Sequence, residues 1–293
     1  MGSVVTLIAG PDAGPSLAAL AETLGNRLGA GPPDWLGPGE ALDLAFDGVA
    51  AEEARALCRE AVGEAPVDWL VQPAAGRRKA VLVADMESTI IGQEMLDELA
   101  EAVDARAKVE DITARAMAGE LDFEAALAER VELLAGLPES LLDQVAGRMT
   151  LNPGARTLVR TLAANGVRTA LVSGGFTCFA DQVAEACGFH EVQANRLEVE
   201  DGHLNGQVVP PVIGAAGKLD ALQRLAAERG VALEECCTLG DGANDAPMLA
   251  AAGLGIAYRG KPPAREAAKI NLAHGDLTAV LYLQGFRREE FVS

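Results

Sequence analysis

The chain has 293 residues, a formal net charge of −19 and a hydrophobic fraction of 49%. The length fits about two domains, and the apolar content is sufficient for buried cores, which excludes a fully disordered chain. The excess of acidic residues argues against binding to nucleic acid or to an anionic membrane surface.

The cysteines and histidines point to a reduced protein without a zinc site. The five cysteines form no CxxC pair, and the three histidines, His190, His203 and His274, are far apart in the sequence. The N-terminal region lacks the basic and apolar segments of a signal peptide, and no apolar run reaches the ~20 residues of a membrane span. These features predict a cytoplasmic protein.

Residues 1–75 predict a small α+β domain. Short apolar runs alternate there with helical patterns and are separated by Gly/Pro turns. We expect strands at Val4–Ala9, Leu42–Phe46 and Val67–Val71, and helices at Ser16–Leu28 and Glu52–Val62. Residues 73–79, which are rich in Gly, Arg and Lys, predict a linker to the next domain.

Residues 79–293 predict an α/β domain with a parallel sheet. Expected strands are Val81–Ala84, Arg168–Val172, Cys236–Leu239, Leu254–Ala257 and Ile270–Leu272, with a hairpin over 195–209. Expected helices between them are Gly154–Asn165, Thr177–Cys187, Lys218–Arg229, Ala246–Ala251 and Leu277–Leu283. Alternating strands and helices favour a parallel sheet that is covered on both faces.

Four further helical patterns fall between the first two strands of this domain. They are Gln93–Val103, Lys108–Ala118, Phe123–Leu134 and Glu139–Arg148. This placement predicts a helical cap, at about residues 93–150, inserted into the α/β domain.

Acidic residues stand at the ends of two predicted strands. Asp85 follows Val81–Ala84, while Asp241 and Asp245 follow Cys236–Leu239. Ligand sites in open α/β sheets lie beyond the carboxyl ends of the strands, so these side chains are expected to meet. Crowded carboxylates need a cation, and an all-oxygen set without histidine suits Mg²⁺. The sequence therefore predicts Mg²⁺-dependent chemistry on a phosphate.

Other residues near these strand ends suit phosphate chemistry. Asp85 can attack phosphorus, and Glu87, two residues further on, can act as general acid and base. Ser173 and Gly174 form a predicted tight turn between a strand and a helix, where free N–H groups bind anions. Lys218 opens a predicted helix, where a cation opposes the helix dipole and therefore suggests a functional role.

The chemistry-bearing segments resemble the haloacid dehalogenase superfamily of phosphotransferases, and within it the phosphatases that act on O-phospho-L-serine. The resemblance covers about residues 78–285. It rests on segments that occur in the family's order at plausible spacings: residues 84–89, 92–94, 123–131, 171–176, 217–218, 239–245 and 275–279. It implies a Rossmannoid parallel sheet with a helical cap, and the last step of serine biosynthesis.

The resemblance also implies roles for individual residues. Asp85 is the nucleophile and a Mg²⁺ ligand, Glu87 is the general acid/base with a metal-binding backbone carbonyl, Asp241 is a ligand and Asp245 supports the metal site. The residues implied to hold the phosphate are Ser173, Gly174, Lys218 and Asn244. Glu94 and Arg130 fall where the family recognises the ammonium and carboxylate of the substrate, which one anion and one guanidinium complement.

Glu87 departs from the family, which has Asp at this position. The extra methylene moves the carboxylate by ~1 Å or more, and a displacement of this size can cost ~10²-fold in rate. Three interpretations stay open: an adjusted pocket with Glu as acid/base, a slow enzyme, or a non-catalytic amino-acid or phosphate binder. Transfer of the phosphoryl group to another alcohol, such as homoserine, is a further alternative to hydrolysis.

Residues 1–75 lie where relatives carry a small domain of the ACT type. The predicted order of strands and helices is only loosely compatible with that domain, so we expect a degenerate ACT-like unit without a strong ligand site of its own. A homodimer is one assembly compatible with the sequence, which does not decide the oligomeric state.

Overall fold

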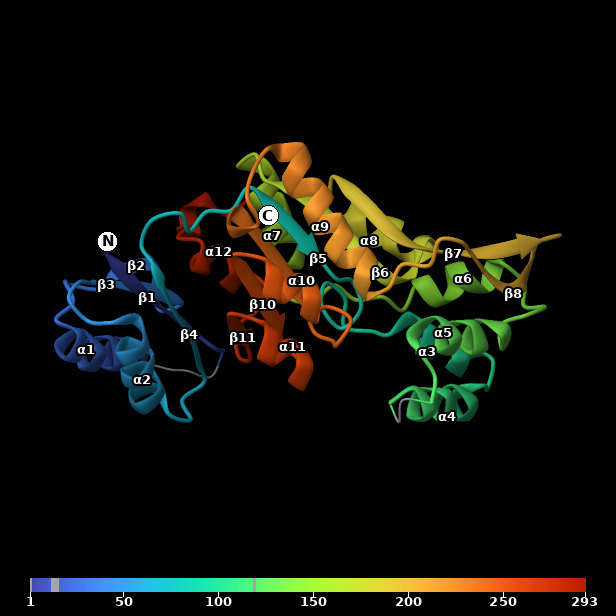
Figure 1. Ribbon diagram of the computed structural model, residues 1–293, viewed down its shortest axis with the longest axis horizontal. Helices are drawn as coiled ribbons and strands as arrows, with labels where there is room; N and C mark the ends of the chain where they lie inside the picture. Colours follow the sequence, from blue (N-terminus) through green and yellow to red (C-terminus); the bar gives the residue numbers. More distant parts are fainter. Residues whose placement is uncertain (1, 12–15, 118–119) are drawn as a thin grey trace.

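The structure is a computed structural model that describes residues 2–11, 16–117 and 120–293, and within them the chain forms two β-sheets (Figure 1). The N-terminal sheet and its helices occupy one end of the molecule. Their elements are β1 (Ser3–Ala9), α1 (Ser16–Leu28), β2 (Asp34–Gly37), β3 (Ala41–Phe46), α2 (Ala51–Val62) and β4 (Val67–Pro73).

The N-terminal sheet is antiparallel, with the strand order β2-β3-β1-β4. Its core contains Leu7 and Leu44 from the strands and Leu24 and Cys58 from the helices, all of them fully buried. This arrangement confirms the predicted α+β unit. Strand β2 was not predicted, because Trp35 and Leu36 lie between proline and glycine residues that are typical of turns.

The second sheet is mainly parallel, with the strand order β11-β10-β9-β5-β6-β7-β8. Only β8 runs antiparallel, to β7, among the pairings of the described residues. The strands are β5 (Val81–Ala84), β6 (Arg168–Phe176), β7 (Glu191–Glu200), β8 (His203–Val209), β9 (Cys236–Gly240), β10 (Leu254–Tyr258) and β11 (Ile270–Leu272). The predicted α/β fold is therefore confirmed.

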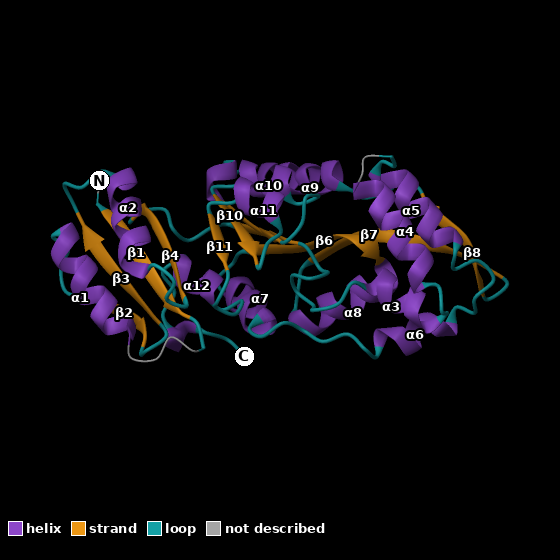
Figure 2. Ribbon diagram, turned by 90° about the horizontal axis from the view of Figure 1, so that it is seen from below, coloured by secondary structure: helices purple, strands orange, loops and turns teal. Residues whose placement is uncertain are grey.

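Helices cover both faces of the parallel sheet (Figure 2). On one face lie α7 (Ala155–Ala164), α8 (Thr177–Cys187) and α12 (Ala279–Leu283), and on the other lie α9 (Ala215–Arg229), α10 (Ala246–Ala251) and α11 (Pro262–Ala267). Burial on both faces explains why β5 is apolar at every position rather than at alternate ones. Short 3₁₀ turns occur at Leu233–Glu235 and Arg288–Glu290. Among the described residues, no helix has the length and apolarity needed to cross a membrane.

Four helices between β5 and β6 form a group at the end of the molecule opposite the N-terminal sheet (Figures 1 and 2). They are α3 (Met95–Ala102), α4 (Arg106–Met117), α5 (Phe123–Glu132) and α6 (Ser140–Ala146). We refer to this group as the cap. The predicted end of its second helix, Ala118, lies outside the described residues.

The β7–β8 hairpin extends from the sheet and is bonded to the cap. The Gly136 N–H donates to the carbonyl of Leu204 at 2.8 Å, and the Leu204 N–H donates to the carbonyl of Leu137 at 2.9 Å. The hairpin turn at Asp201 and Gly202 agrees with the sequence prediction. The cap thus contacts the sheet through this ribbon as well as through its own two chain connections.

Arg77 anchors the segment between the two sheets. Its guanidinium donates to Asp43 Oδ2 at 2.5 Å, to Thr6 Oγ1 at 3.0 Å, and to the carbonyls of Tyr282 and Leu283 at 3.0 and 3.2 Å. The side chains of Arg77 and Asp43 are only 12% and 9% exposed. The segment predicted as a linker therefore carries a buried ionic contact with β3 and α12.

Candidate active site

Three neighbouring strands bring the predicted site residues to one edge of the parallel sheet. Strand β5 pairs with β6 on one side and with β9 on the other. Asp85 follows β5, Asp241 follows β9, and Ser173 lies near the end of β6. The Asp85 N–H donates to the carbonyl of Leu239 at 2.9 Å, which extends the ladder by one step and fixes the backbone of Asp85 against β9.

A buried acidic cluster occupies this edge. One carboxylate oxygen from each of Asp85, Asp241 and Asp245 lies within 4.8 Å of the others. The ammonium of Lys218 lies 2.7 Å from Asp85 Oδ1 and 2.6 Å from Asp245 Oδ1, and its side chain is fully buried. The first turn of α9 thus delivers a cation into the interior, where the sequence suggested a functional lysine.

Burial and crowding raise the pKa values of the carboxyl groups in this cluster. Burial, reinforced by Asp245, raises the pKa of Asp85 well above its usual range although Lys218 opposes the rise. Burial also raises the pKa of Asp241 despite the nearby Lys261. Burial alone would lower the pKa of Lys218, but Asp85 and Asp245 outweigh it and raise that pKa. Such an all-oxygen set of under-neutralised carboxylates fits a divalent cation.

Asp245 holds the loop that carries Asp241. Its Oδ2 accepts the N–H groups of Asp241 at 3.0 Å and Gly242 at 2.9 Å, while Oδ1 accepts from Lys218. A Cβ on Gly240 would lie 2.4 Å from Asp245 Cγ, so glycine is required at this position. With both oxygens engaged, Asp245 is suited to orienting Asp241 and Lys218.

Glu87 lies in a space that accommodates its length. Its Oε1 accepts the N–H of Met95 at 2.8 Å, at the start of α3. A Cβ on Gly175 would lie 2.9 Å from Glu87 Oε2, so the missing side chain at Gly175 makes room for the carboxylate. Burial first, and then the charge of Glu94, raise the pKa of Glu87 to about 7. A pKa near neutrality suits a group that both donates and accepts a proton.

The backbone at Ser173 differs from the sequence prediction. We expected a tight turn at Ser173–Gly175, but β6 continues through these residues to Phe176 with an irregular register against β7. Asn195 of β7 explains the extended path, because its Nδ2 donates to the carbonyl of Gly174 at 2.8 Å. Ser173 is fully buried, and its hydroxyl accepts the Gly175 N–H at 2.9 Å.

Three further residues implied to contact the substrate are Glu94, Arg130 and Asn244. The Ser88 hydroxyl donates to Glu94 Oε1 at 2.7 Å, from a backbone with φ of 52°, a conformation that non-glycine residues rarely adopt. Arg130, on α5, donates to the carbonyl of Ala126 at 3.1 Å and lowers the pKa of Glu87. Asn244 is partly buried, and its side chain has no hydrogen bond within the described part of the chain.

Lys261 lies at the acidic cluster, and the sequence analysis did not single it out. Its ammonium lies 3.1 Å from Asp241 Oδ2 and 3.8 Å from Glu94 Oε1, and its N–H donates to the Asp241 carbonyl at 2.7 Å. Pro262 after it marks a helix start, and α11 indeed begins there. No sequence signal places that helix start opposite Asp241.

Comparisons with known proteins agree with this geometry. Residues 82–250 match the family model of haloacid dehalogenase-like hydrolases. A phosphoserine phosphatase of Streptomyces coelicolor is 44% identical over 86% of this chain, and one of Streptococcus thermophilus is 43% identical over 69% of this chain and 94% of its own length. The chain spans 62% of the length of the Streptomyces protein.

Solved structures give the same result. A haloacid dehalogenase family hydrolase of Salmonella enterica serovar Typhi superposes with a TM-score of 0.85 at 32% identity, covering 96% of this chain and 98% of that one. A substrate-bound phosphoserine phosphatase superposes with a TM-score of 0.65 at 36% identity, over 70% of this chain and 98% of that one. This chain belongs to the haloacid dehalogenase-like hydrolases.

Proposed function

We propose that the protein is a Mg²⁺-dependent phosphatase that hydrolyses O-phospho-L-serine to L-serine and phosphate, the last step of serine biosynthesis. The observation that carries the proposal is the unequal hydrogen bonding of the two oxygens of the Asp85 carboxylate. Its Oδ1 is held by Lys218 at 2.7 Å and by the Met86 N–H at 2.8 Å, while Oδ2 has no hydrogen bond among the described residues. A carboxylate fixed through one oxygen presents the other as a nucleophile.

In the first half-reaction, a carboxylate oxygen of Asp85 attacks phosphorus. The bond between phosphorus and the serine oxygen breaks as the aspartyl-phosphate forms. Glu87 donates a proton to the departing oxygen, which a group with a pKa of about 7 can do near neutral pH.

In the second half-reaction, a water molecule attacks the aspartyl-phosphate. Glu87, now deprotonated, accepts a proton from this water, and the bond between phosphorus and the Asp85 oxygen breaks. Phosphate leaves and the carboxylate of Asp85 is restored. The hydrogen bond from the Met95 N–H keeps the Glu87 carboxylate in place through both steps.

Asp85, Asp241 and the backbone carbonyl of Glu87 would hold the Mg²⁺ ion, with Asp245 supporting them. The ion would neutralise the cluster and the charge that develops on the phosphoryl oxygens. The pKa values of Asp85 and Asp241, which burial raises, support this assignment, because a bound cation would favour the charged form of both carboxylates.

The remaining residues would bind the substrate. The phosphate would be held by Ser173, the Gly174 N–H, Lys218 and Asn244. Glu94 would receive the ammonium group and Arg130 the carboxylate, since each carries the opposite charge. The cap, which carries Arg130, would cover the substrate and exclude water.

Phosphate release from O-phospho-L-serine in the presence of Mg²⁺ tests the proposal. Asp85→Asn should lower turnover by about 10⁴-fold or more, because the nucleophile is lost. Asp220→Asn, an exposed residue of the same type on α9, is the matched control and should retain full activity. Circular dichroism of both variants checks that they are folded.

Three results would contradict the proposal. Binding of phosphoserine without phosphate release would favour a non-catalytic binder. A new phosphoester formed in the presence of homoserine, in preference to free phosphate, would favour a phosphotransferase. Undiminished turnover in Asp85→Asn would exclude Asp85 as the nucleophile.

A further inference from the structure

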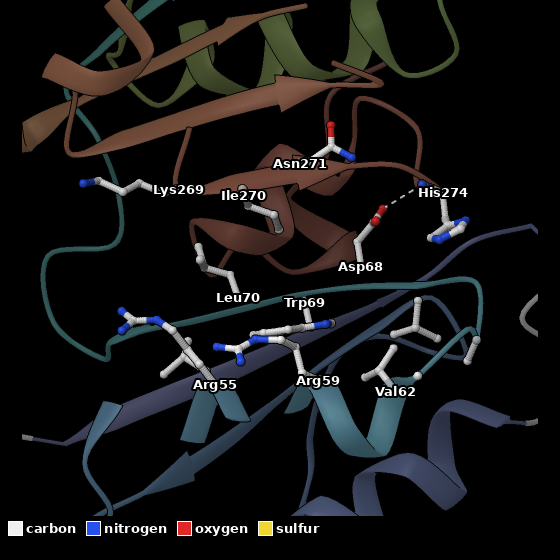
Figure 3. Close-up of a pocket in the computed structure, with 14 residues that line it drawn as sticks. Arg55, Arg59, Val62, Asp68, Trp69, Leu70, Lys269, Ile270, Asn271 and His274 are labelled. Atoms are coloured by element: carbon white, nitrogen blue, oxygen red, sulfur yellow. Dashed lines mark hydrogen bonds between the residues drawn. The ribbon is translucent and has the colours of Figure 1, made fainter. Parts of the chain in front are cut away.

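A cavity lies where the two sheets meet, and its lining does not include Asp85, Asp241 or Asp245. Its volume is about 410 Å³, which is enough for a small molecule, and its walls come from α2 and β4 on one side and from β11 and its flanking residues on the other (Figure 3). We refer to it as the junction cavity. The sequence predicted no strong ligand site within residues 1–75 alone, and this cavity forms only where that unit meets β11.

The junction cavity is lined by cations, although the whole chain is strongly acidic. Arg55 and Arg59 reach it from α2, and Lys269 reaches it from the residue before β11. Both arginines share one carboxylate, that of the exposed Glu52, at 3.1 and 3.2 Å. Lys269 has no ion pair within the described part of the chain. The three cations therefore exceed the acidic charge available to them.

The acidic residue in the cavity wall, Asp68, uses its carboxylate oxygens for hydrogen bonds to the backbone. Asp68 is 4% exposed, and its oxygens accept the N–H groups of Ala273, His274 and Gly275 at 2.9, 3.1 and 2.7 Å. These bonds join β4 to the loop after β11 and fix the two walls relative to each other. Asp68 thus serves to build the cavity, and both of its oxygens are already occupied by backbone N–H groups.

Part of the inner surface of the cavity is apolar. Leu70 and Ile270 come from opposite walls, and the Trp69 ring lies between the ends of the cavity in Figure 3. Arg55 and Lys269 mark one end of that view and His274 marks the other. An apolar surface that ends in two cations from different walls complements a molecule with an apolar body and one anionic group.

We propose that the junction cavity binds a small organic anion. A carboxylate or phosphate group pairs with Arg55 and Lys269, with Arg59 close by, and the apolar body lies against Trp69, Leu70 and Ile270. Such a ligand contacts both sheets at once. It therefore stabilises the full chain by mass action, independently of any chemistry at Asp85.

The test uses 2-naphthoate as the anionic probe and 2-naphthamide as its neutral counterpart of nearly the same shape. Trp35→Phe leaves Trp69 as the single tryptophan, so the fluorescence of Trp69 reports binding inside the cavity. We expect 2-naphthoate to change this fluorescence saturably and to raise the melting temperature. 2-Naphthamide should bind at least about tenfold more weakly.

Charge-matched double variants locate the binding. Arg55→Gln with Lys269→Gln should weaken 2-naphthoate binding by about tenfold or more. Arg27→Gln with Arg265→Gln removes the same charge from exposed positions outside the cavity and should change binding by less than about twofold. Equal binding of the two probes, equal weakening in both double variants, or no saturable change in Trp69 fluorescence would overturn the proposal.

Discussion

Two buried ionic clusters differ in their balance of charge. At the junction of the sheets, Arg77 faces one carboxylate, Asp43, and its remaining donors reach a hydroxyl and two carbonyls. At the strand ends, three carboxylates face one buried ammonium, that of Lys218. The first cluster is neutral and fully bonded, so it stabilises the fold. The second is short of positive charge, so it retains the capacity to bind a cation and a phosphate.

Among the changes that distinguish the two clusters, the largest effect is expected from Lys218→Met. This change removes the one buried cation of the strand-end cluster, and turnover of phosphoserine should fall by about 10³-fold or more because phosphate charge is no longer neutralised. Steady-state phosphate release measures the effect. Lys108→Met, which changes an exposed lysine on α4, is the control. Comparable losses in both variants would mean that general charge, rather than the cluster, sets the rate.

The balanced cluster can be broken by Arg77→Leu, which leaves the Asp43 carboxylate buried without its partner. The free energy of unfolding should drop by about 3 kcal/mol or more. Urea denaturation gives the value. The neighbouring Arg78→Leu, at a side chain that is 49% exposed, should cost no more than about 1 kcal/mol.

A double change sharpens this result. Arg77→Leu combined with Asp43→Leu removes both charges and should recover much of the lost stability, since no unpaired charge remains. If the double variant is as unstable as the single one, packing rather than charge explains the role of Arg77.

The next prediction concerns metal binding, which we expect at the strand-end cluster and not at the Arg77–Asp43 cluster. Adding Mg²⁺ to protein treated with a chelator should stabilise it, by about 2.7 kcal/mol when the ion is present at one hundred times its dissociation constant. Thermal unfolding with and without Mg²⁺ measures the gain. Asp241→Asn should abolish most of it, whereas Asp220→Asn should not. An equal gain in all three proteins would place the ion elsewhere.

The smallest effect concerns the fit of Glu87. Gly175→Ala should lower turnover by about 10- to 100-fold, because the new Cβ displaces the Glu87 carboxylate. The shorter side chain of Glu87→Asp should leave turnover equal or raise it, and should reduce the cost of Gly175→Ala. A large drop for Glu87→Asp would show that the pocket requires the longer acid.

The sequence predicted most elements of the fold, and the two incorrect predictions discussed here have the same physical cause. Apolar runs such as Val81–Ala84 identify buried strands directly, because both faces of a parallel sheet are covered. Strand β2 was missed since pairing with β3 overrides its turn-like flanks, and Ser173–Gly175 was misread since Asn195 holds the strand extended. In both places a partner distant in sequence determines the backbone.

The sequence was sufficient to predict the acidic residues of the candidate site, but it did not reveal all of the lysines that lie beside them. Asp85, Asp241 and Asp245 follow apolar strands, and topology alone brings strand ends together. Lys218 gave a weak signal as a misplaced helix cation. Lys261 gave no signal in the sequence. The residue before it, Gly260, is held by a contact distant in sequence, because its N–H donates to Asn271 Oδ1 at 3.0 Å. Likewise, sequence could not reveal that Gly175 makes room for Glu87.

The bond between the hairpin and the cap has a mechanical consequence. The described residues attach the cap to the α/β domain through its two chain connections, through the packing of α6 on α8, and through the β7–β8 ribbon, which is bonded at Gly136 and Leu137. A body held at two points can rotate about the line between them, whereas a third attachment off that line resists this rotation. The β7–β8 ribbon therefore opposes rotation of the cap relative to the parallel sheet.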